Sequence, residues 1–182
     1  MIVIPTPFPD ILIFASQTQH DSRGWFMESF NQREFSQLVA GSYSFVQDNH
    51  SYSKQGVVRG LHYQLPPMAQ GKLIRVVVGA VWSVAVDIRV KSPTFQQWFG
   101  TELTAMNQHQ LWIPPGFAHG FVALHSDNQL LYKTTAHYSP VHERRIHWKD
   151  PTLHIDWPLP SSPLLTEKDE AAPPLSKADL FL

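Results

Sequence analysis

Hydrophobic and polar residues alternate with a period of two along much of this chain. In the stretch VWSVAVDIRV, which begins at residue 81, Val84, Val86 and Ile88 alternate with small or charged residues. This period is typical of a strand with one buried face. Similar short runs are SFVQDNHSYS, GVVRGLHYQ, KLIRVVV, QWFGTELT, QLWIPP, GFVAL and QLLYKTTAHY. Turn signals such as KQG, KSP and SDN separate them, so the pattern predicts an antiparallel sandwich or barrel.

Only two stretches have the pattern of a helix. In NQREFSQLVAG, Asn31 is the expected N-cap, Glu34 occupies the capping-box position and Gly41 is the expected terminator. The stretch LTEKDEAAPP predicts one helical turn that starts at Thr166 and stops before Pro173. We therefore expect one mainly β domain over residues 1–182, a small barrel with short helical additions.

Composition excludes several classes of protein. The 182 residues favour one domain, and 14 Lys+Arg against 15 Asp+Glu give no basic field for nucleic acid or anionic lipid. The absence of cysteine excludes disulfides and thiolate metal sites and suits a reducing, cytoplasmic compartment. The first residues, MIVIPTPFPDILIF, lack a basic region and are interrupted by prolines, so we expect neither a signal peptide nor a membrane span.

Three basic residues stand among apolar strand positions. They are Arg59 and His62 in RGLHYQ and Lys72 in GKLIRVVV. Burying an unpaired charge is costly, so they need partners or a purpose. Strict alternation puts Arg59 and His62 on opposite faces of their strand, unless a bulge at Gly60 brings them together. Taken singly, His62 also fits a core histidine, and Arg59 and Lys72 fit solvated strand ends.

The stretch LWIPPGFAHGF raises the question of a metal site. A rigid turn precedes His119, which we expect just before the strand GFVAL. In cupin barrels such a turn carries a metal-ligating histidine, together with a second histidine and a carboxylate on earlier strands. Here Gln64 occupies the second histidine's place, and the next acidic residue, Asp87, is too far along. We therefore expect no metal.

Other polar residues fit ordinary structural roles when each is taken alone. Those roles are turn chemistry, a polar strand face, a buried tyrosine with one partner, a surface ion pair and stabilisation of a helix dipole. The residues concerned are Arg23, Glu28, Gln47, Asn49, Tyr132, Glu143 and Asp169.

The order of these stretches changes that assessment, because it resembles the dTDP-4-dehydrorhamnose 3,5-epimerase family. The resemblance runs from about residue 8 to about residue 175, through DSRGWFMESF, QDNHSYSKQGVVRGLHYQLPPMAQGKLIRV, VAVDIRVKSPTF, LWIPPGFAHGF, YKTTAHYSP and EKD. It implies a cupin-like jelly-roll β-barrel, a homodimer, and an isomerase of a dTDP-4-keto-6-deoxy sugar in deoxysugar biosynthesis. It also implies that no metal or organic cofactor takes part.

The resemblance also implies roles for single residues. His62 would be the catalytic base, assisted by Asp169, with Tyr132 as the acid. Lys72 would lie at the sugar carbonyl, with His119 nearby. The residues implied to hold the nucleotide sugar are Arg23, Glu28, Gln47, Asn49, Arg59, Glu143 and Lys168. Gln96 and Arg145 depart from the family pattern, where glycines are usual, and we expect both to affect loop shape rather than chemistry.

The chemistry of a 4-keto sugar agrees with these roles. The hydrogens on C3 and C5 adjoin a carbonyl and can leave as protons, and a neutral histidine backed by a carboxylate is a suitable base near pH 7. The resulting enolate needs a cation or donor at its oxygen, and inversion needs an acid on the opposite face. The planar fork of an arginine suits a diphosphate.

Three alternatives stay open. One is a monofunctional 3- or 5-epimerase of a related dTDP-4-keto-6-deoxy sugar, which would share the same residues. The second is a metal-dependent cupin oxygenase. The third is a catalytically silent sugar-binding barrel, against which the joint presence of His62, Lys72 and Tyr132 argues.

Overall fold

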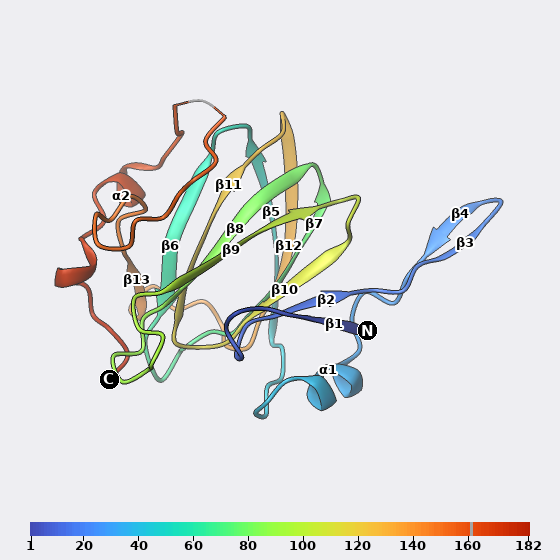
Figure 1. Ribbon diagram of the computed structural model, residues 1–182, viewed down its shortest axis with the longest axis horizontal. Coiled ribbons are helices and arrows are strands. Elements are labelled where there is room, and N and C mark those ends of the chain that lie inside the picture. The colour runs from blue at the N-terminus through green and yellow to red at the C-terminus, as the bar shows by residue number, and fades with distance from the viewer. Residues whose placement is uncertain (161) are drawn as a thin grey trace.

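Two antiparallel sheets lie face to face in the computed structural model, which describes residues 1–160 and 162–182 (Figure 1). The first sheet has the order β1-β2-β10-β7-β12-β5, and the second has the order β13-β6-β11-β8-β9. The strands of the first sheet are β1 (Ile2–Pro5), β2 (Leu12–Ala15), β10 (His109–Ile113), β7 (Lys72–Val78), β12 (Asp127–Thr134) and β5 (Gln47–Lys54). Those of the second are β13 (Glu143–Arg145), β6 (Val58–Gln64), β11 (Phe117–Ala123), β8 (Ala80–Asp87) and β9 (Trp98–Thr104). This arrangement confirms the predicted mainly β jelly roll.

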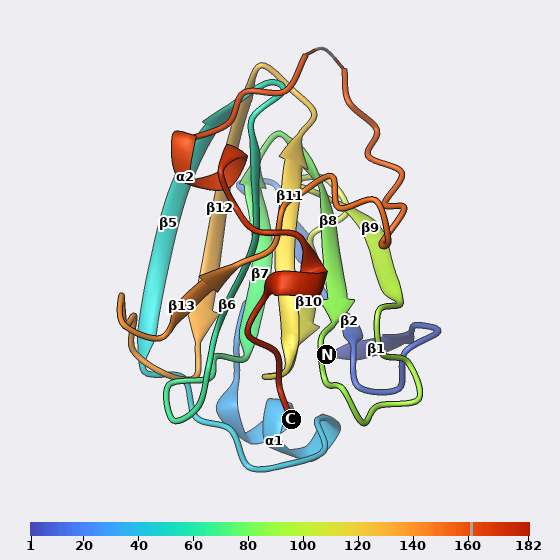
Figure 2. The same cartoon turned by 90° about the vertical axis from the view of Figure 1, so that its left-hand side faces the viewer.

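The main core lies between the two sheets. Ile74 and Leu130 of the first sheet and Val81 and Phe117 of the second belong to one buried cluster there. The other face of each sheet is covered by a segment of its own. Helix α1 (Gln32–Leu38) covers the outer face of the first sheet. Its buried residue, Phe35, belongs to the hydrophobic cluster there. The chain after β13 winds across the outer face of the second sheet (Figure 2).

Both predicted helices are present, but Gly41 as the terminator of the first was wrong, because α1 ends at Leu38 with Val39 as its C-cap. The side chain of Asn31 caps α1 by accepting from the backbone N–H groups of Arg33 and Glu34. The capping-box role of Glu34 was wrong, because its carboxylate accepts from the amino group of Met1 at 2.7 Å. Helix α2 (Glu167–Glu170) is the expected single turn, capped by Thr166. No helix in the described part of the chain has the length and apolarity that a membrane span requires.

The eight predicted strand runs all contain strands, but five short strands were missed. They are β1, β2, β13 and the two strands of a hairpin, β3 (Gln19–Asp21) and β4 (Gly24–Phe26). A period of two cannot be recognised over three or four residues. The expectation that His119 precedes its strand was wrong as well. Strand β11 begins at Phe117, which pairs with Asp87 directly after the proline turn, so His119 lies inside it.

Candidate active site

A bulge at Gly60 gives strand β6 its two inward-facing polar side chains. The pairing of β6 with β11 slips between the pairs His119–His62 and Phe121–Arg59. Gly60 has φ +122°, and a Cβ there would lie 2.5 Å from the Cα of Gly120. Only glycine fits both conditions. The predicted strict alternation is therefore wrong at this point, and the alternative of a bulge is confirmed, because Arg59 and His62 line one cavity.

Between the sheets, three residues line two adjoining pockets of about 140 Å³ each: His62, Lys72 and Tyr132. One pocket is also lined by Gln47, Asn49 and Glu143, and the other by Arg59 and His119. We call the two pockets together the His62 cavity. Its second-sheet wall carries His62 and its first-sheet wall carries Lys72 and Tyr132. A molecule held there is therefore contacted from both sides.

Behind His62 stands the carboxylate of Asp169, at 2.5 Å from Nε2. Asp169 is buried in the short helix α2, whose cap, Thr166, accepts from its backbone N–H. Burial alone would raise the pKa of Asp169, but hydrogen bonds from His62 and Thr166 and the charge of Arg145 outweigh it and lower that pKa. The ionised carboxylate therefore holds the Nε2–H of His62 and leaves Nδ1 as the basic nitrogen.

The opposite wall of the cavity holds an enclosed ammonium group. Lys72 Nζ donates to the carbonyl oxygen of His62 at 3.3 Å. Burial lowers the pKa of Lys72 to about 8, against a smaller opposing effect of Glu143. Burial also lowers the pKa of His119 well below its usual value, as do the nearby charges of Lys72 and His62. His119 is therefore neutral near pH 7, and Lys72 is the cation of the pair.

The phenol of Tyr132 projects from β12 into the same cavity. Its hydroxyl has no hydrogen-bond partner among the residues that the structure describes, although it is partly buried. Burial raises the pKa of Tyr132, and the positive charge of Arg59 opposes part of that rise. The hydroxyl therefore keeps its proton near pH 7 and has it available to donate.

A further recess shares Arg59 and His62 with the cavity, and we call it the mouth of the cavity. Its lining also includes Arg145, Thr166, Glu167, Lys168 and Asp169, so that three basic side chains face two carboxylates there. Arg59 donates to Ser53 Oγ and to the carbonyl oxygen of Tyr52, each at 3.0 Å, and these neutral partners leave its charge uncompensated.

One expectation about the two family departures was wrong. Arg145 Nε lies 3.2 Å from Asp169 Oδ1, and Arg145 Nη2 lies 2.9 Å from Glu143 Oε2. Arg145 thus contacts the carboxylate behind His62, because β13 pairs with β6 and sets Arg145 opposite His62. Gln96 agrees with its expected effect on loop shape. It takes φ +68°, a left-handed conformation that favours glycine, in the loop between β8 and β9.

The structure does not bring Arg23 and Glu28 to the cavity. Arg23 lies in the turn of the β3–β4 hairpin, its side chain is 87% exposed, and its ion partner is Asp21 at 2.5 Å. Glu28 accepts from Asn31 Nδ2 and lines a separate recess beside the hairpin. The hairpin extends away from the two sheets (Figure 1). The other predicted site residues line the cavity or its mouth, apart from these two.

Sequence reasoning missed several polar residues around the cavity. Ser51 continues the inward series of Gln47 and Asn49 along β5. The alternation of strand residues could therefore have predicted that Ser51 faces the cavity. Tyr138 donates to Glu143, and Ser83 contacts His119; both contacts join separate strands or loops and leave no local signal. Gln64, the residue at the place of a metal-ligating histidine, donates to the carbonyls of Met68 and His137 and so holds two loops.

No group of three or more histidine, aspartate or glutamate side chains forms a metal-binding cluster within residues 1–160 and 162–182. His62 and His119 are cross-strand neighbours, but their ring nitrogens contact Asp169 and Ser83. The absence of a metal from the reaction stays a prediction.

Comparisons with known proteins identify the family of this chain. The family model described as dTDP-4-dehydrorhamnose 3,5-epimerase matches residues 5–177. A dTDP-4-dehydrorhamnose 3,5-epimerase from Shigella flexneri is 53% identical over 182 residues, which cover all of both chains. A dTDP-6-deoxy-D-glucose-3,5-epimerase from Legionella pneumophila, solved with dTDP-4-keto-L-rhamnose, superposes with a TM-score of 0.95 and 46% identity over 98% of this chain and 94% of that one. A 3′-monoepimerase from Streptomyces bikiniensis, solved with dTDP-quinovose, has a TM-score of 0.89 and 32% identity over 94% of this chain and 87% of that one. The chain therefore belongs to the dTDP-4-dehydrorhamnose 3,5-epimerase family.

Proposed function

We propose that this member of the dTDP-4-dehydrorhamnose 3,5-epimerase family inverts C3 and C5 of dTDP-4-dehydro-6-deoxy-D-glucose and yields dTDP-4-dehydro-L-rhamnose. One observation carries the proposal: the His62–Asp169 pair and the hydroxyl of Tyr132 enter a single cavity from facing sheets, with the ammonium of Lys72 beside them. Inversion needs a base and an acid on opposite faces of the sugar ring, and this arrangement supplies both.

The reaction at each carbon takes two proton transfers. Nδ1 of His62 removes the proton next to the carbonyl, while Asp169 stabilises the imidazolium that forms. The electron pair moves onto the carbonyl oxygen, where the ammonium of Lys72 stabilises the enolate. Tyr132 then returns a proton to the opposite face. His62 then gives its proton to solvent and Tyr132 regains one, so that the same groups act at the second carbon after the sugar ring moves within the site.

The nucleotide end of the substrate is proposed to lie at the mouth of the cavity. Arg59 and Lys168 supply positive charge there, and Arg59 has no carboxylate partner within residues 1–160 and 162–182. A guanidinium binds a diphosphate through paired N–H groups. The complex of the Legionella protein with dTDP-4-keto-L-rhamnose supports a nucleotide sugar as the substrate of this chain too. Gln47, Asn49 and Glu143 are proposed to contact the substrate deeper in the cavity.

Arg23 and Glu28 can serve the same substrate only if a second chain supplies them. Their hairpin stands away from the cavity of its own chain and exposes 56% of Trp25 and 68% of Phe26 (Figure 1). We therefore propose a homodimer in which the β3–β4 hairpin of one copy reaches the mouth of its partner's cavity. Mixing the Arg23→Ala and His62→Asn variants should restore activity, because a mixed dimer has one complete site. Mixtures that stay as inactive as their components contradict this arrangement.

The proposed reaction moves only protons, so it requires neither a metal nor an organic cofactor. Extensive treatment with a chelator should leave the turnover unchanged, and activity that returns only with an added divalent ion would instead favour a metal-dependent oxygenase-type site. We further propose that residues 1–182 act as one catalytic domain in the cytoplasm.

The decisive experiment follows deuterium. Incubation with dTDP-4-keto-6-deoxyglucose in heavy water should place deuterium at both C3 and C5 and invert both carbons. Label and inversion at one carbon only would identify a monoepimerase, the activity of the Streptomyces bikiniensis relative. No label at either carbon would reject the proposal.

A further inference from the structure

Ser83 is a fully buried residue of β8 that contacts a wall of the His62 cavity from behind. Its Oγ lies 2.9 Å from Nε2 of His119. It alternates along β8 with Val84, and it shares the inward face with Val81 and Ala85 of the core between the sheets. Within the described residues, the Ser83 hydroxyl has no other hydrogen-bond partner.

Burial determines the direction of this hydrogen bond. If Nε2 of His119 carried the proton, the hydroxyl hydrogen of Ser83 would lack an acceptor at a place closed to water, and such unpaired donors are rare and costly. If Ser83 donates instead, both atoms are satisfied. A neutral imidazole has one N–H, so the proton of His119 then lies on Nδ1.

Nδ1 of His119 has no partner in the described chain, yet it is open to its surroundings. The single buried side-chain nitrogen or oxygen without a partner among residues 1–160 and 162–182 is Oγ of Ser51. Nδ1 is therefore not completely enclosed by the chain, and His119 lines the same cavity as Lys72 and Tyr132. The low pKa of His119, caused by its burial and by Lys72 and His62, agrees with a neutral ring.

We infer that Ser83 is a positioning residue that holds His119 as the Nδ1–H tautomer, so that His119 offers the substrate a neutral hydrogen-bond donor beside Lys72. The acceptor is the oxygen at C4, which becomes the enolate oxygen during the reaction, and this contact rests on the function proposed above. The tautomer does not rest on it. Two fixed donors at one oxygen stabilise its developing charge more than one does.

The tautomer can be observed by nuclear magnetic resonance in the intact protein. Labelling with ¹⁵N-histidine separates protonated from unprotonated ring nitrogens, and the His119 signals are those that vanish in His119→Asn. We expect Nδ1 to be protonated in the parent protein and the Nε2–H form to gain population in Ser83→Ala. Ser51→Ala is the matched control, since it removes an unpartnered serine hydroxyl from the same cavity, and it should leave the His119 signals unchanged. A parent protein protonated at Nε2, or unchanged His119 signals in Ser83→Ala, overturns the inference.

Kinetics then separate positioning from a merely structural role. Ser83→Ala should lower kcat about 10-fold with little change in KM, which is less than the 10²–10³-fold loss expected for removing a direct oxyanion donor. Ser83→Cys, which keeps a weak donor of similar size, should fall between Ser83→Ala and the parent. Adding Ser83→Ala to His119→Asn should cost nothing further, because Ser83 acts through His119. An equal loss in both backgrounds overturns the positioning role, whereas a correct tautomer in a protein that exchanges no C3 or C5 proton refutes only the proposed function.

Discussion

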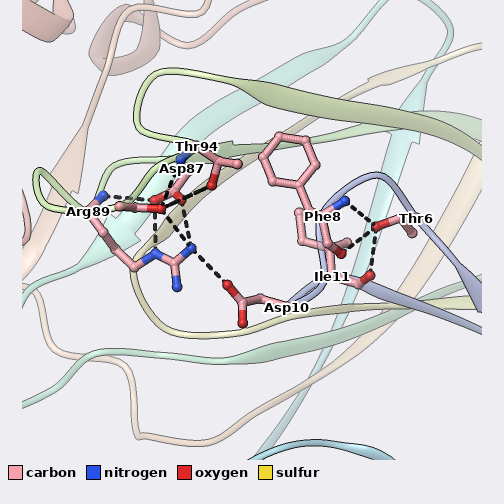
Figure 3. Close-up of polar contacts among 8 residues, drawn as sticks. Thr6, Phe8, Asp10, Ile11, Asp87, Arg89 and Thr94 are labelled. Atoms are coloured by element: carbon pink, nitrogen blue, oxygen red, sulfur yellow. Dashed lines mark hydrogen bonds and ion pairs between the residues drawn. The ribbon is translucent and has the colours of Figure 1, made fainter.

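Strand β8 carries Ser83 beside the His62 cavity and, four residues later, Asp87 in a second group of polar side chains (Figure 3). This Asp87 cluster consists of Asp87, Arg89, Ser92, Thr94 and Asp10. Asp87 is fully buried, and its two oxygens accept five hydrogen bonds from Arg89, Ser92 and Thr94. Arg89 is shared with Asp10 at 2.9 Å and lies over the ring of Phe117 at 4.6 Å.

The two groups use their charges in opposite ways. Burial alone would raise the pKa of Asp87, but the hydrogen bonds around it outweigh burial and lower that pKa, so the buried charge of Asp87 is satisfied within the chain. In the His62 cavity, Lys72, Arg59 and the hydroxyl of Tyr132 have neutral partners or none in the described chain. The comparison shows that a self-satisfied cluster holds loops together, whereas groups with unused hydrogen-bonding capacity are available to a substrate.

The largest effect should follow from removing the base. His62→Ala should reduce both deuterium wash-in and inversion by roughly 10²–10⁴-fold, the usual contribution of a general base. Its free energy of unfolding should fall by about 1–3 kcal/mol, because the buried carboxylate of Asp169 loses the hydrogen bond from His62 and keeps only its contacts with Arg145 and Thr166. Rates of exchange by mass spectrometry and urea unfolding curves measure the two quantities. Near-parental exchange would mean that another group is the base.

Removing the acid should reduce inversion much more than deuterium wash-in. Tyr132→Phe keeps the base and the ammonium, so a proton can leave, exchange from His62 with solvent and return to the same face. Inversion should therefore fall by about 10²-fold or more, and wash-in should fall much less, provided that the proton on His62 exchanges before it returns. The ratio of wash-in to inversion is the measurement. Inversion at close to the parental rate would show that Tyr132 is not the acid.

A substitution in the Asp87 cluster should lower stability and leave activity nearly unchanged. Asp87→Ala leaves the partners of a buried carboxylate unpaired and should lower the free energy of unfolding by about 3 kcal/mol, near the lower end for a broken buried ion pair. The kcat of the folded fraction should stay near that of the parent. Asp48→Ala is the control, since Asp48 is 71% exposed in its pair with Lys133 and such pairs contribute at most about 1 kcal/mol. A large loss of kcat without a loss of stability would contradict the comparison.

Arg59 tests the mouth of the cavity. Arg59→Ala should raise the KM for the nucleotide-linked sugar by about 10–100-fold, which corresponds to the 1.5–3 kcal/mol of a charge-assisted hydrogen bond. The kcat should change less, because the groups around His62 remain. Arg144→Ala is a suitable control, because Arg144 already pairs with Asp179 at 2.6 Å. Equal activity of the parent protein on the free keto-sugar would refute a diphosphate contact.

The smallest effect concerns pH. With a pKa of about 8, Lys72 loses its charge as the pH rises through 8, so exchange should fall above that pH, by about tenfold per unit at the limit. Its ordinary pKa in the unfolded chain is higher, so the unfolded state binds more protons there and the Lys72 contribution to stability rises with pH. Lys72→Arg, whose guanidinium stays charged, should be slower but should lack this fall. A fall that persists in Lys72→Arg would assign it to another group.

Much of the fold follows from local sequence. The alternation in VWSVAVDIRV and the capping residues Asn31 and Thr166 predict strand and helices because each depends on neighbours within a few residues. The resemblance of the ordered motifs also named His62, Lys72, Tyr132 and Asp169, which the structure brings to one cavity and its rear wall.

Tertiary structure decided the rest. The slip of pairing at Gly60 turns Arg59 and His62 to one side, and it depends on the close approach of Gly120 on another strand. The contacts of Arg145 with Asp169 and of Ser83 with His119 likewise join residues far apart in the chain. The hairpin position keeps Arg23 out of its own chain's cavity, although the motif suggests a common site. Periodicity reports which face of an element a residue occupies, but hydrogen bonds and burial depend on which elements meet, and only the packed sheets determine that.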